Sequence, residues 1–247
     1  MEKIISKFFC FLLIYLTISC SNDNENGQEI DLDLTNGLIL QALLDGNALD
    51  TSGNMNNGEI IGSVNIIVNR NNESNAALNF NEDEGHIDFG NIPELEINYD
   101  STISISVWIK PNGGQVSWDT ILNQFFEGPP PSALGRFYLG LNPNNQRVRW
   151  NILGNQLESS NQIPIDEWTH LVVTYNNRKA VMFVNGILDG ELNFGQETLG
   201  FGSGAPFKIG KQSLTPTSGS GFSGSIDDIN IFDRLLSDVE IQALFNN

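Results

Sequence analysis

"HLVVTYNNRKAVMFVNGI", residues 170–187, contains the clearest fold signal of this 247-residue chain. Two runs rich in β-branched and aromatic residues, His170–Tyr175 and Ala180–Val184, are separated by polar residues. Runs of this length and composition favour β-strands. Asn185 and Gly186 both accept the positive φ of a tight hairpin turn, so the second run should turn back into another strand. The stretch therefore predicts successive antiparallel strands.

Further strand-like runs occur between Asn- and Gly-rich clusters along the rest of the chain. The segment "NPNNQ" (142–146) is expected to join two of these strands. Three prolines in Glu127–Ser132 exclude central-strand pairing there, because proline has no amide N–H for the ladder. The other predicted strands are Ile103–Ile109, Thr120–Phe126, Arg136–Leu141, Arg147–Ile152 and Ile226–Phe232.

One helix is predicted, over Ser237–Phe245 at the end of the chain. Ser237 and Glu240 have the spacing of a capping box. Val239, Ala243 and Leu244 share one face, with Ile241 at its edge. Many short strands with a single terminal helix predict an all-β domain of two packed antiparallel sheets, covering residues 38–247.

The first 19 residues have the pattern of an export signal. Lys3 and Lys7 precede a 12-residue, largely apolar stretch, Phe8–Ser19, which is too short to span a membrane. The stretch ends in "LTISC", which resembles a bacterial lipobox, although Thr17 stands where that pattern prefers Leu. The resemblance implies lipidation of Cys20. The alternative is an ordinary secretory signal cut near Ser19.

The cysteine count and the next segment support an anchored, exported protein. The only other cysteine, Cys10, lies inside the predicted signal, so Cys20 would be the single thiol of the mature chain. Residues 20–37 are polar and acidic and cannot bury enough surface to fold alone. They are expected to form a disordered tether. Such an acidic stretch resembles a signal for display on the outer face of the outer membrane; the alternative is a plain linker.

Composition limits the partners of the domain. Without Glu2, Lys3 and Lys7, the chain keeps 29 acidic and 10 basic residues. Nucleic acid is excluded as an expected partner, because phosphate binding needs a basic surface. Neutral sugars or cations suit the acidic surface better.

Catalytic motifs are missing from the sequence. Glycoside hydrolysis needs two carboxylates at a set separation. Glu82, Asp83 and Glu84 lie in an expected turn, and the adjacent Asp227 and Asp228 should point to opposite faces of a strand. His170 is expected to be structural. The chain is therefore predicted not to be an enzyme.

An ordered set of segments resembles the laminin-G-like, concanavalin A-like jelly roll. The segments are "DGNALDTSGNMNNG" (45–58), "ALNFN" (77–81) with "HIDFG" (86–90), "ISISVWIKP" (103–111), "IDEWTHLVVTY" (165–175) with "VMFVNGIL" (181–188), "FKIG" (207–210) and "GSIDDINIFDRLLSDVEIQAL" (224–244). The resemblance covers residues 38–247. It implies a two-sheet sandwich of a kind found in binding modules and in glucanases, but the Glu-x-Asp-x-x-Glu strand motif of the glucanases is absent.

The resemblance also implies one structural Ca²⁺ where the N-terminal loop meets the last long strand. Asp50, carbonyls of residues 53–58 and Asp227 are the implied ligands, with Asp45 as a further one. Calcium takes six to eight oxygen ligands, and backbone carbonyls can supply several. The alternative is a loop held by Asx turns, without a metal.

Aromatic and basic residues beside predicted loops are the candidate ligand-binding side chains. Trp118 follows a turn-rich stretch, Trp150 follows "NPNNQ", and Arg136 and Tyr138 follow the proline-rich loop. An exposed aromatic ring can stack on a sugar. The alternative for Trp150 and Tyr138 is an inward orientation, which strand alternation allows.

Three functions remain open at this stage. The first is a surface-displayed lipoprotein with a non-catalytic, carbohydrate-binding domain stabilised by Ca²⁺. The second is a module that binds surface or matrix proteins and so mediates adhesion, which would expose an apolar patch. The third is a glycoside hydrolase or polysaccharide lyase, which would need two carboxylates in one cleft. The fold alone does not choose among them.

Overall fold

A computed structural model describes residues 32–114, 119–124, 136–195, 204–211 and 221–247. Residues Leu32–Asn247 form one compact unit, described here by itself. The predicted signal, Cys20 and most of the predicted tether lie outside the described residues, as does Trp118. No helix among the described residues is both long and apolar enough to span a membrane.

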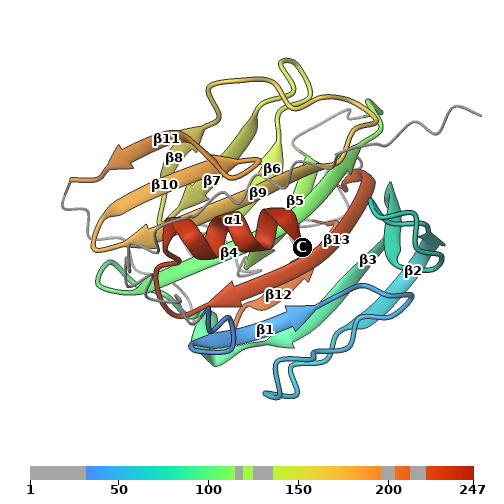
Figure 1. Cartoon of the computed structure of the whole chain (residues 1–247), viewed down its shortest axis with the longest axis horizontal. Coiled ribbons are helices and arrows are strands. Elements are labelled where there is room, and N and C mark those ends of the chain that lie inside the picture. Colours follow the sequence, from blue (N-terminus) through green and yellow to red (C-terminus); the bar gives the residue numbers. More distant parts are fainter. Residues whose placement is uncertain (1–31, 115–118, 125–135, 196–203, 212–220) are drawn as a thin grey trace, which may run out of the picture. The chain divides into compact units, whose positions relative to one another are not determined.

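The described residues form thirteen antiparallel strands, one short 3-10 helix and one α-helix (Figure 1). The hydrogen-bonded order is β11-β10-β9-β4-β13-β3-β12-β5-β6-β7-β8, with β1 added to β13 and β2 to β3. The elements are β1 (Leu38–Ala42), β2 (Glu59–Ile67), β3 (Ala77–Asn91), η1 (Pro93–Leu95), β4 (Thr102–Pro111), β5 (Asp119–Gln124), β6 (Phe137–Leu141), β7 (Val148–Ile152), β8 (Asn155–Glu158), β9 (Thr169–Asn176), β10 (Lys179–Val184), β11 (Ile187–Asn193), β12 (Pro206–Ile209), β13 (Ser223–Phe232) and α1 (Asp238–Asn246).

The strands form two layers, as Figure 1 shows, and the predicted jelly-roll sandwich is confirmed. We call the layer of β1, β13, β4, β9, β10 and β11 the front layer, and the layer of β12, β5, β6, β7 and β8 the back layer. Strand β3 connects them, because Leu78–Asn81 pair with β13 while Ile87–Asn91 pair with β12. Glu82, between these halves, has φ of 50°. The expected turn at Glu82–Glu84 is therefore wrong, since the strand continues through an irregular position.

The core lies between the layers and follows strand alternation. In β4, Ile103, Ile105, Val107 and Ile109 are buried in this core. The alternate residues, Ser104, Ser106 and Trp108, face the opposite side of the front layer. Helix α1 lies across that side (Figure 1).

Local signals predicted the helix and the hairpins well. The capping box of Ser237 and Glu240 is present. Asn185 and Gly186 have φ of 50° and 74° and join β10 to β11, as predicted. The predicted packing face of the helix is wrong at Val239, which is 45% exposed. Leu244 is buried as predicted, and Ile241, which was expected only at the edge of that face, is buried as well.

Candidate functional site

Asp50 fastens its own loop by accepting hydrogen bonds from backbone amides. Its Oδ1 accepts hydrogen bonds from the amides of Gln41 (3.1 Å) and Ser52 (2.8 Å). Its Oδ2 accepts from the amide of Asn56 at 2.9 Å. Asn54 donates from its side chain to the carbonyl of Leu38 at 2.8 Å. The loop after β1 is thus fastened by Asx-type bonds, which was the alternative to the metal.

Asp227 and Asp228 face the same cation. Arg70 Nη1 lies 2.8 Å from Asp227 Oδ2, and Arg70 Nη2 lies 2.7 Å from Asp228 Oδ2. The expectation that the two carboxylates point to opposite faces is wrong. The pairing of β13 with β4 shifts between Asp227 and Asn230, and Asp228 has φ of 43°. A bulge of this kind breaks the alternation of side chains along a strand.

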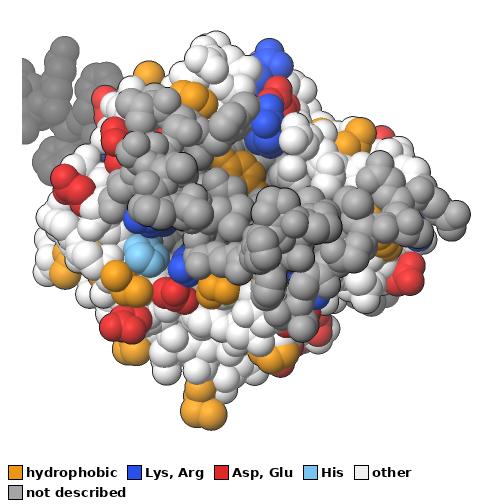
Figure 2. Space-filling view, turned by 180° about the vertical axis from the view of Figure 1, so that it is seen from behind, with side chains coloured by type: hydrophobic (Ala, Val, Ile, Leu, Met, Phe, Trp, Pro, Cys, Tyr) orange, Lys and Arg blue, Asp and Glu red, His pale blue; other side chains and the backbone are white. Residues whose placement is uncertain are grey.

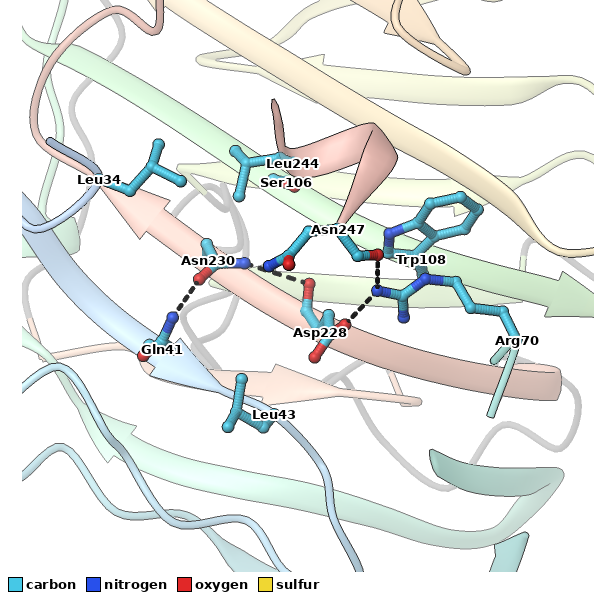
Figure 3. A pocket seen from close by; sticks show the side chains of 10 residues that line it. All are labelled: Leu34, Gln41, Leu43, Arg70, Ser106, Trp108, Asp228, Asn230, Leu244 and Asn247. Carbon is cyan, nitrogen blue, oxygen red and sulfur yellow. Dashed lines mark hydrogen bonds and ion pairs between the residues drawn. The ribbon is translucent and has the colours of Figure 1, made fainter. Parts of the chain in front are cut away.

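Arg70 has further partners around these carboxylates (Figure 3). Its Nη2 donates to the backbone oxygen of Asn247 at 2.9 Å, and its guanidinium lies 4.6 Å from the ring centre of Trp108. The Asp227 side chain is 1% exposed. Burial and the neighbouring Asp228 raise the pKa of Asp227 to about 7, although Arg70 opposes this shift. Burial also raises the pKa of Asp228. One guanidinium therefore contacts two carboxylates, of which Asp227 is buried and Asp228 is partly exposed.

The predicted calcium ligands do not form a common site. Asp45 is exposed, Asp50 binds backbone amides, and Asp227 binds Arg70. Among the described residues, no three Asp, Glu, His or Cys side chains are placed to hold a metal ion. A guanidinium supplies positive charge to Asp227 in this arrangement, and calcium binding by Asp50, Asp227 and Asp45 stays a prediction.

The small pocket beside Arg70 is a structural network (Figure 3). Its volume is about 70 Å³, below the roughly 300 Å³ at which ligand pockets begin. Gln41 Nε2 donates to Asn230 Oδ1 at 3.0 Å, so polar groups of the pocket already bond to each other. The ring of Trp108 is covered by Arg70, and it is 5.0 Å from His170 and 5.7 Å from Phe245 between ring centres.

His170 lies beneath this pocket, and its environment agrees with the expected structural role. The side chain is fully buried, with Nε2 2.8 Å from Ser106 Oγ. Burial, assisted by the charge of Arg70, lowers the pKa of His170 to about 3. The ring is therefore neutral near pH 7 and is not poised to exchange a proton there.

The predicted ligand-binding side chains are not exposed. Trp150 has no exposed surface and packs against Phe137 in the core, with ring centres 5.7 Å apart. The prediction that it binds a ligand is wrong, because its position in β7 alternates inward. Tyr138 and Arg136 are 7% and 8% exposed, so neither offers an open surface. Arg136 binds within the domain, 3.8 Å from Glu96.

Opposite the core, the back layer carries a continuous row of polar side chains. Register pairs join Asp88 to Lys208, Lys208 to Asn123, Asn123 to Tyr138, Tyr138 to Asn151 and Asn151 to Gln156. We call these six residues the polar row. It crosses six strands, from β3 to β8, and spans roughly 24 Å at about 4.8 Å between neighbouring strands. Figure 2 shows the molecule from the side of this layer.

The ends of the polar row are open to solvent and its centre is not. Gln156 is exposed, and Asn151, Asp88 and Lys208 are partly exposed. Asn123 is fully buried, and its Oδ1 has no hydrogen-bond partner among the described residues. A buried acceptor of this kind calls for a water or ligand hydroxyl as donor. In β7, Arg149 and Asn151 alternate with apolar residues. This alternation was visible in the sequence and indicates a polar outer face, but the sequence-based candidates were chosen mainly for their aromatic rings.

A second, charged row lies beside the first. Arg149 in β7 is paired in register with Glu158 in β8, and their side chains form an ion pair at 2.6 Å. Both side chains are partly exposed. The back layer therefore offers hydrogen-bond donors and acceptors side by side, which is the pattern that hydroxyl-rich ligands need.

Solved structures share this architecture. Domain 4 of an extracellular arabinanase from Geobacillus stearothermophilus, solved with arabinotriose, has a TM-score of 0.58 and 20% identity over 84% of this chain and 97% of that domain. The binding domain of Paraclostridial mosquitocidal protein 1 has a TM-score of 0.67 and 19% identity over 87% of this chain. A Trypanosoma rangeli sialidase has a TM-score of 0.60 and 16% identity over 85% of this chain and 32% of the sialidase.

These identities show the fold alone. The chain spans about half of the mosquitocidal protein's binding domain, 53% of its length. No curated protein matches the chain. The family model described as the concanavalin A-like lectin/glucanases superfamily matches residues 81–242, which is more than half of the chain. Together with the two-layered antiparallel sandwich, this match shows that the chain belongs to the concanavalin A-like lectin/glucanase superfamily.

Proposed function

We propose that this protein is an exported, surface-displayed lipoprotein whose jelly-roll domain binds carbohydrate without catalysing its cleavage. The observation that carries the proposal is the polar row of the back layer. Its exposed members are amides, an ammonium group and a carboxylate. They lie on a rigid sheet over a length that fits several sugar units.

The chemistry of the polar row suits sugar hydroxyls. Asn151 and Gln156 carry amides that both donate and accept hydrogen bonds, and Arg149 with Glu158 adds a charged donor and acceptor beside them. Side chains on strands are held more firmly than those on loops, so their spacing is fixed before a ligand arrives. The arabinotriose complex of a similar domain supports this class of ligand.

Ion pairs that involve the carboxylates of the domain support the proposal that it binds carbohydrate without cleaving it. A glycosidase needs two carboxyl groups that face each other across a site. In the described residues, Asp227 and Asp228 bind Arg70, Glu158 binds Arg149, and Asp88 lies 3.4 Å from Lys208. Each of these carboxylates already contacts a cation of the protein, so none of them is presented unpaired to a ligand.

Native affinity gels test the proposal. The chain from Ser21 onward would be run through gels containing single polysaccharides, and retardation by one glycan class is expected. Asn151→Ala and Gln156→Ala should each reduce the retardation. The matched control is Asn193→Ala, which removes an exposed amide from β11 in the front layer. Equal loss in all three variants, or free migration of the unsubstituted chain in every gel, would reject the proposed site.

Protein binding is the second candidate function, and one observation favours it. A groove of about 460 Å³ lies between β10, β11 and α1, with Val181, Phe183 and Leu188 in its lining. Leu188 is 56% exposed and its neighbour Ile187 is 71% exposed. If no glycan retards the chain, adhesion of Leu188→Asp to immobilised matrix proteins would be compared with that of the unsubstituted chain. If the groove binds protein, the variant should adhere more weakly.

A further inference from the structure

Helix α1 covers only part of the outer side of the front layer. Its Ile241 and Leu244 are buried in a cluster with Val172 of β9. Strands β10 and β11 lie beyond β9 in the same layer (Figure 1). Their outward side chains line the groove beside α1, and its volume of about 460 Å³ lies in the range of ligand pockets. The groove is therefore an open strip of sheet next to a packed helix.

The floor of the groove is apolar across both strands. Phe183 is in register with Leu188, and Val181 is in register with Glu191, so these side chains share one face of the sheet. Phe183 also packs against the cluster beneath α1, so the floor continues the apolar packing of that helix. Leu188 is more than half exposed. An exposed apolar strip that extends an existing helix interface indicates a place for a second apolar partner.

The dimensions of this strip fit one α-helix. Neighbouring strands are about 4.8 Å apart, so two strands present a strip roughly 10 Å wide, which matches the diameter of a helix with its side chains. Helices that pack side by side lie about 8–10 Å apart. A helix laid along β10 and β11 would therefore contact the sheet and α1 together, with Asp238 and Gln242 of α1 as the side wall.

The edge of β11 is less suited to a partner than its face. The amide of Ser160 donates to Asp189 Oδ2 at 2.6 Å, and the hydroxyl of Ser160 donates to the carbonyl of Asp189 at 2.7 Å. A Cβ at Gly190 would lie 3.3 Å from the side chain of Leu157 in β8. The middle of this edge is already occupied, so addition of a partner strand there would displace these contacts.

Charge limits the kind of helix that fits. Among the charged side chains that line the groove, Lys179 and Glu191 form an ion pair at 2.7 Å. Asp238 has no ion-pair partner in the part of the chain that the structure describes. The lining is therefore net negative, within a chain of 30 acidic and 12 basic residues. A helix with basic residues beside its apolar stripe complements this lining, and an acidic helix is repelled.

We infer that the groove binds an amphipathic α-helix of a partner protein, with apolar residues against Val181, Phe183 and Leu188 and basic residues near Asp238. Helices bind grooves of this type through side chains at positions i, i+3, i+4 and i+7. The inference rests on the second candidate function, for which it names the kind of partner, and it does not depend on carbohydrate binding at the back layer.

Synthetic helical peptides test the inference. Basic peptides carry Leu or Phe at i, i+3, i+4 and i+7, two Lys beside this stripe, and Ala or Gln elsewhere. Acidic counterparts carry Glu in place of Lys, and scrambled basic peptides keep the composition without the stripe. Fluorescence anisotropy measures their dissociation constants with the chain from Ser21 onward. A striped basic peptide should bind, and both its acidic and its scrambled counterpart should bind about tenfold more weakly.

Two substitutions locate the binding. Leu188→Asp should weaken binding of the striped basic peptide about tenfold, because an apolar contact on the floor is lost. Its control is Ile66→Asp, which introduces the same charge at an exposed apolar position of β2 outside the groove. Asp238→Asn should weaken binding about threefold, and its control is Glu94→Gln, at an exposed carboxylate of η1.

The outcomes separate this inference from the proposed functions. Equal binding of striped and scrambled peptides, equal effects of Leu188→Asp and Ile66→Asp, or no binding of any striped peptide would overturn it. If adhesion to matrix proteins still depended on Leu188, the second candidate function would stand without a helical partner. Retardation by glycans is measured separately, so the proposed carbohydrate binding does not depend on either result.

Discussion

Arg70 is the residue whose role local sequence signals did not reveal. It lies between β2 and β3, yet its guanidinium contacts β13, Trp108 of β4 and the chain end at Asn247. Nothing in its immediate sequence distinguishes it from a surface arginine. Its importance depends on partners more than 150 positions away, such as Asp227 at a separation of 157.

Removing the Arg70 side chain should destabilise the domain strongly. Arg70→Ala leaves Asp227 and Asp228 without a cation, and breaking a buried ion pair from one side costs about 3–5 kcal/mol. For a domain of this size, a drop in melting temperature of about 10 °C is expected. Thermal unfolding followed by circular dichroism measures it. Lys179→Ala, which breaks an exposed pair, is the control with a small expected effect. Equal melting temperatures for the two variants would show that the Arg70 cluster is not stabilising.

Chelation tests whether a guanidinium takes the place of the expected calcium. Because Arg70 already contacts a carboxylate oxygen of both Asp227 and Asp228, excess chelator should leave the melting temperature of the unsubstituted chain unchanged. A metal that binds only the folded state would instead stabilise it in proportion to its occupancy. A fall of several degrees on chelation would show instead that a bound cation stabilises the folded chain.

The raised pKa of Asp227 predicts how stability depends on pH. Its pKa is about 7 in the folded chain, because of burial and the nearby Asp228, and ordinary when unfolded. The folded state therefore holds this proton more tightly, and the stabilisation is full below about pH 4 and lost as pH rises through 7. Urea unfolding between pH 4.5 and 7.5 should show a decline of about 3 kcal/mol. Asp227→Asn should flatten this decline, and a parallel decline in the variant would assign it to other groups.

Among the elements, the first turn of α1 is held by a set of charge-assisted hydrogen bonds. Glu240 completes the capping box with Ser237 and accepts from Arg234 through both oxygens, at 2.6 and 3.0 Å. Arg234 also donates to the carbonyl of Asn36 at 2.7 Å, so the bonds tie the helix to the segment before β1. These bonds lower the pKa of Glu240 to about 2, with Arg234 as the largest cause.

Neutralising Glu240 should loosen the helix and expose the rings beneath it. Glu240→Gln is expected to lower the free energy of unfolding at pH 7 by about 2 kcal/mol, since charge-assisted bonds and a cap are lost. The lowered pKa of Glu240 stabilises the folded state above about pH 4.5, and this contribution is lost as the pH falls through 2. The difference in unfolding free energy between Glu240→Gln and the unsubstituted chain should therefore shrink between about pH 4.5 and 2. Urea unfolding at several pH values measures it. Glu191→Gln, at an exposed pair, is the control, and a pH-independent difference would contradict this assignment.

Elements set by local chemistry could be predicted, and elements set by distant partners could not. The capping box and the Asn185–Gly186 turn need only neighbouring residues, and both are present. The irregular position at Glu82 depends on β3 pairing with two different strands, β13 and β12. The bulge at Asp228 likewise depends on the pairing of β13 with β4. A single sequence does not reveal those pairings, so polar residues there were assigned to a turn or to the wrong face.

For the whole molecule, the distribution of charge matters more than its sum. The net charge of −18 favoured neutral sugars or cations as partners. The fold, however, pairs charges locally: Asp227 and Asp228 lie around Arg70 on the front layer, and Lys208 lies 3.4 Å from Asp88 where β12 meets β3. Composition gives the sum of the charges but not these pairings. The family and its two-layered architecture were predictable from ordered motifs because those motifs mark strands and turns.

Lipidation at Cys20 is the remaining prediction, and it concerns how the whole protein is held at the membrane. If the signal is of the lipoprotein type, cells expressing the chain should incorporate labelled palmitate into it, and Cys20→Ser should abolish the label. Cys10→Ser is the matched control, because Cys10 lies inside the predicted signal and should not affect the label. Multiple acyl chains anchor firmly whereas one binds marginally, so the unsubstituted protein should stay with the membrane fraction.

Protease added to intact cells should then digest the domain if it is displayed outside. A label that persists in Cys20→Ser, or a domain protected until the outer membrane is broken, would contradict surface anchoring through this residue.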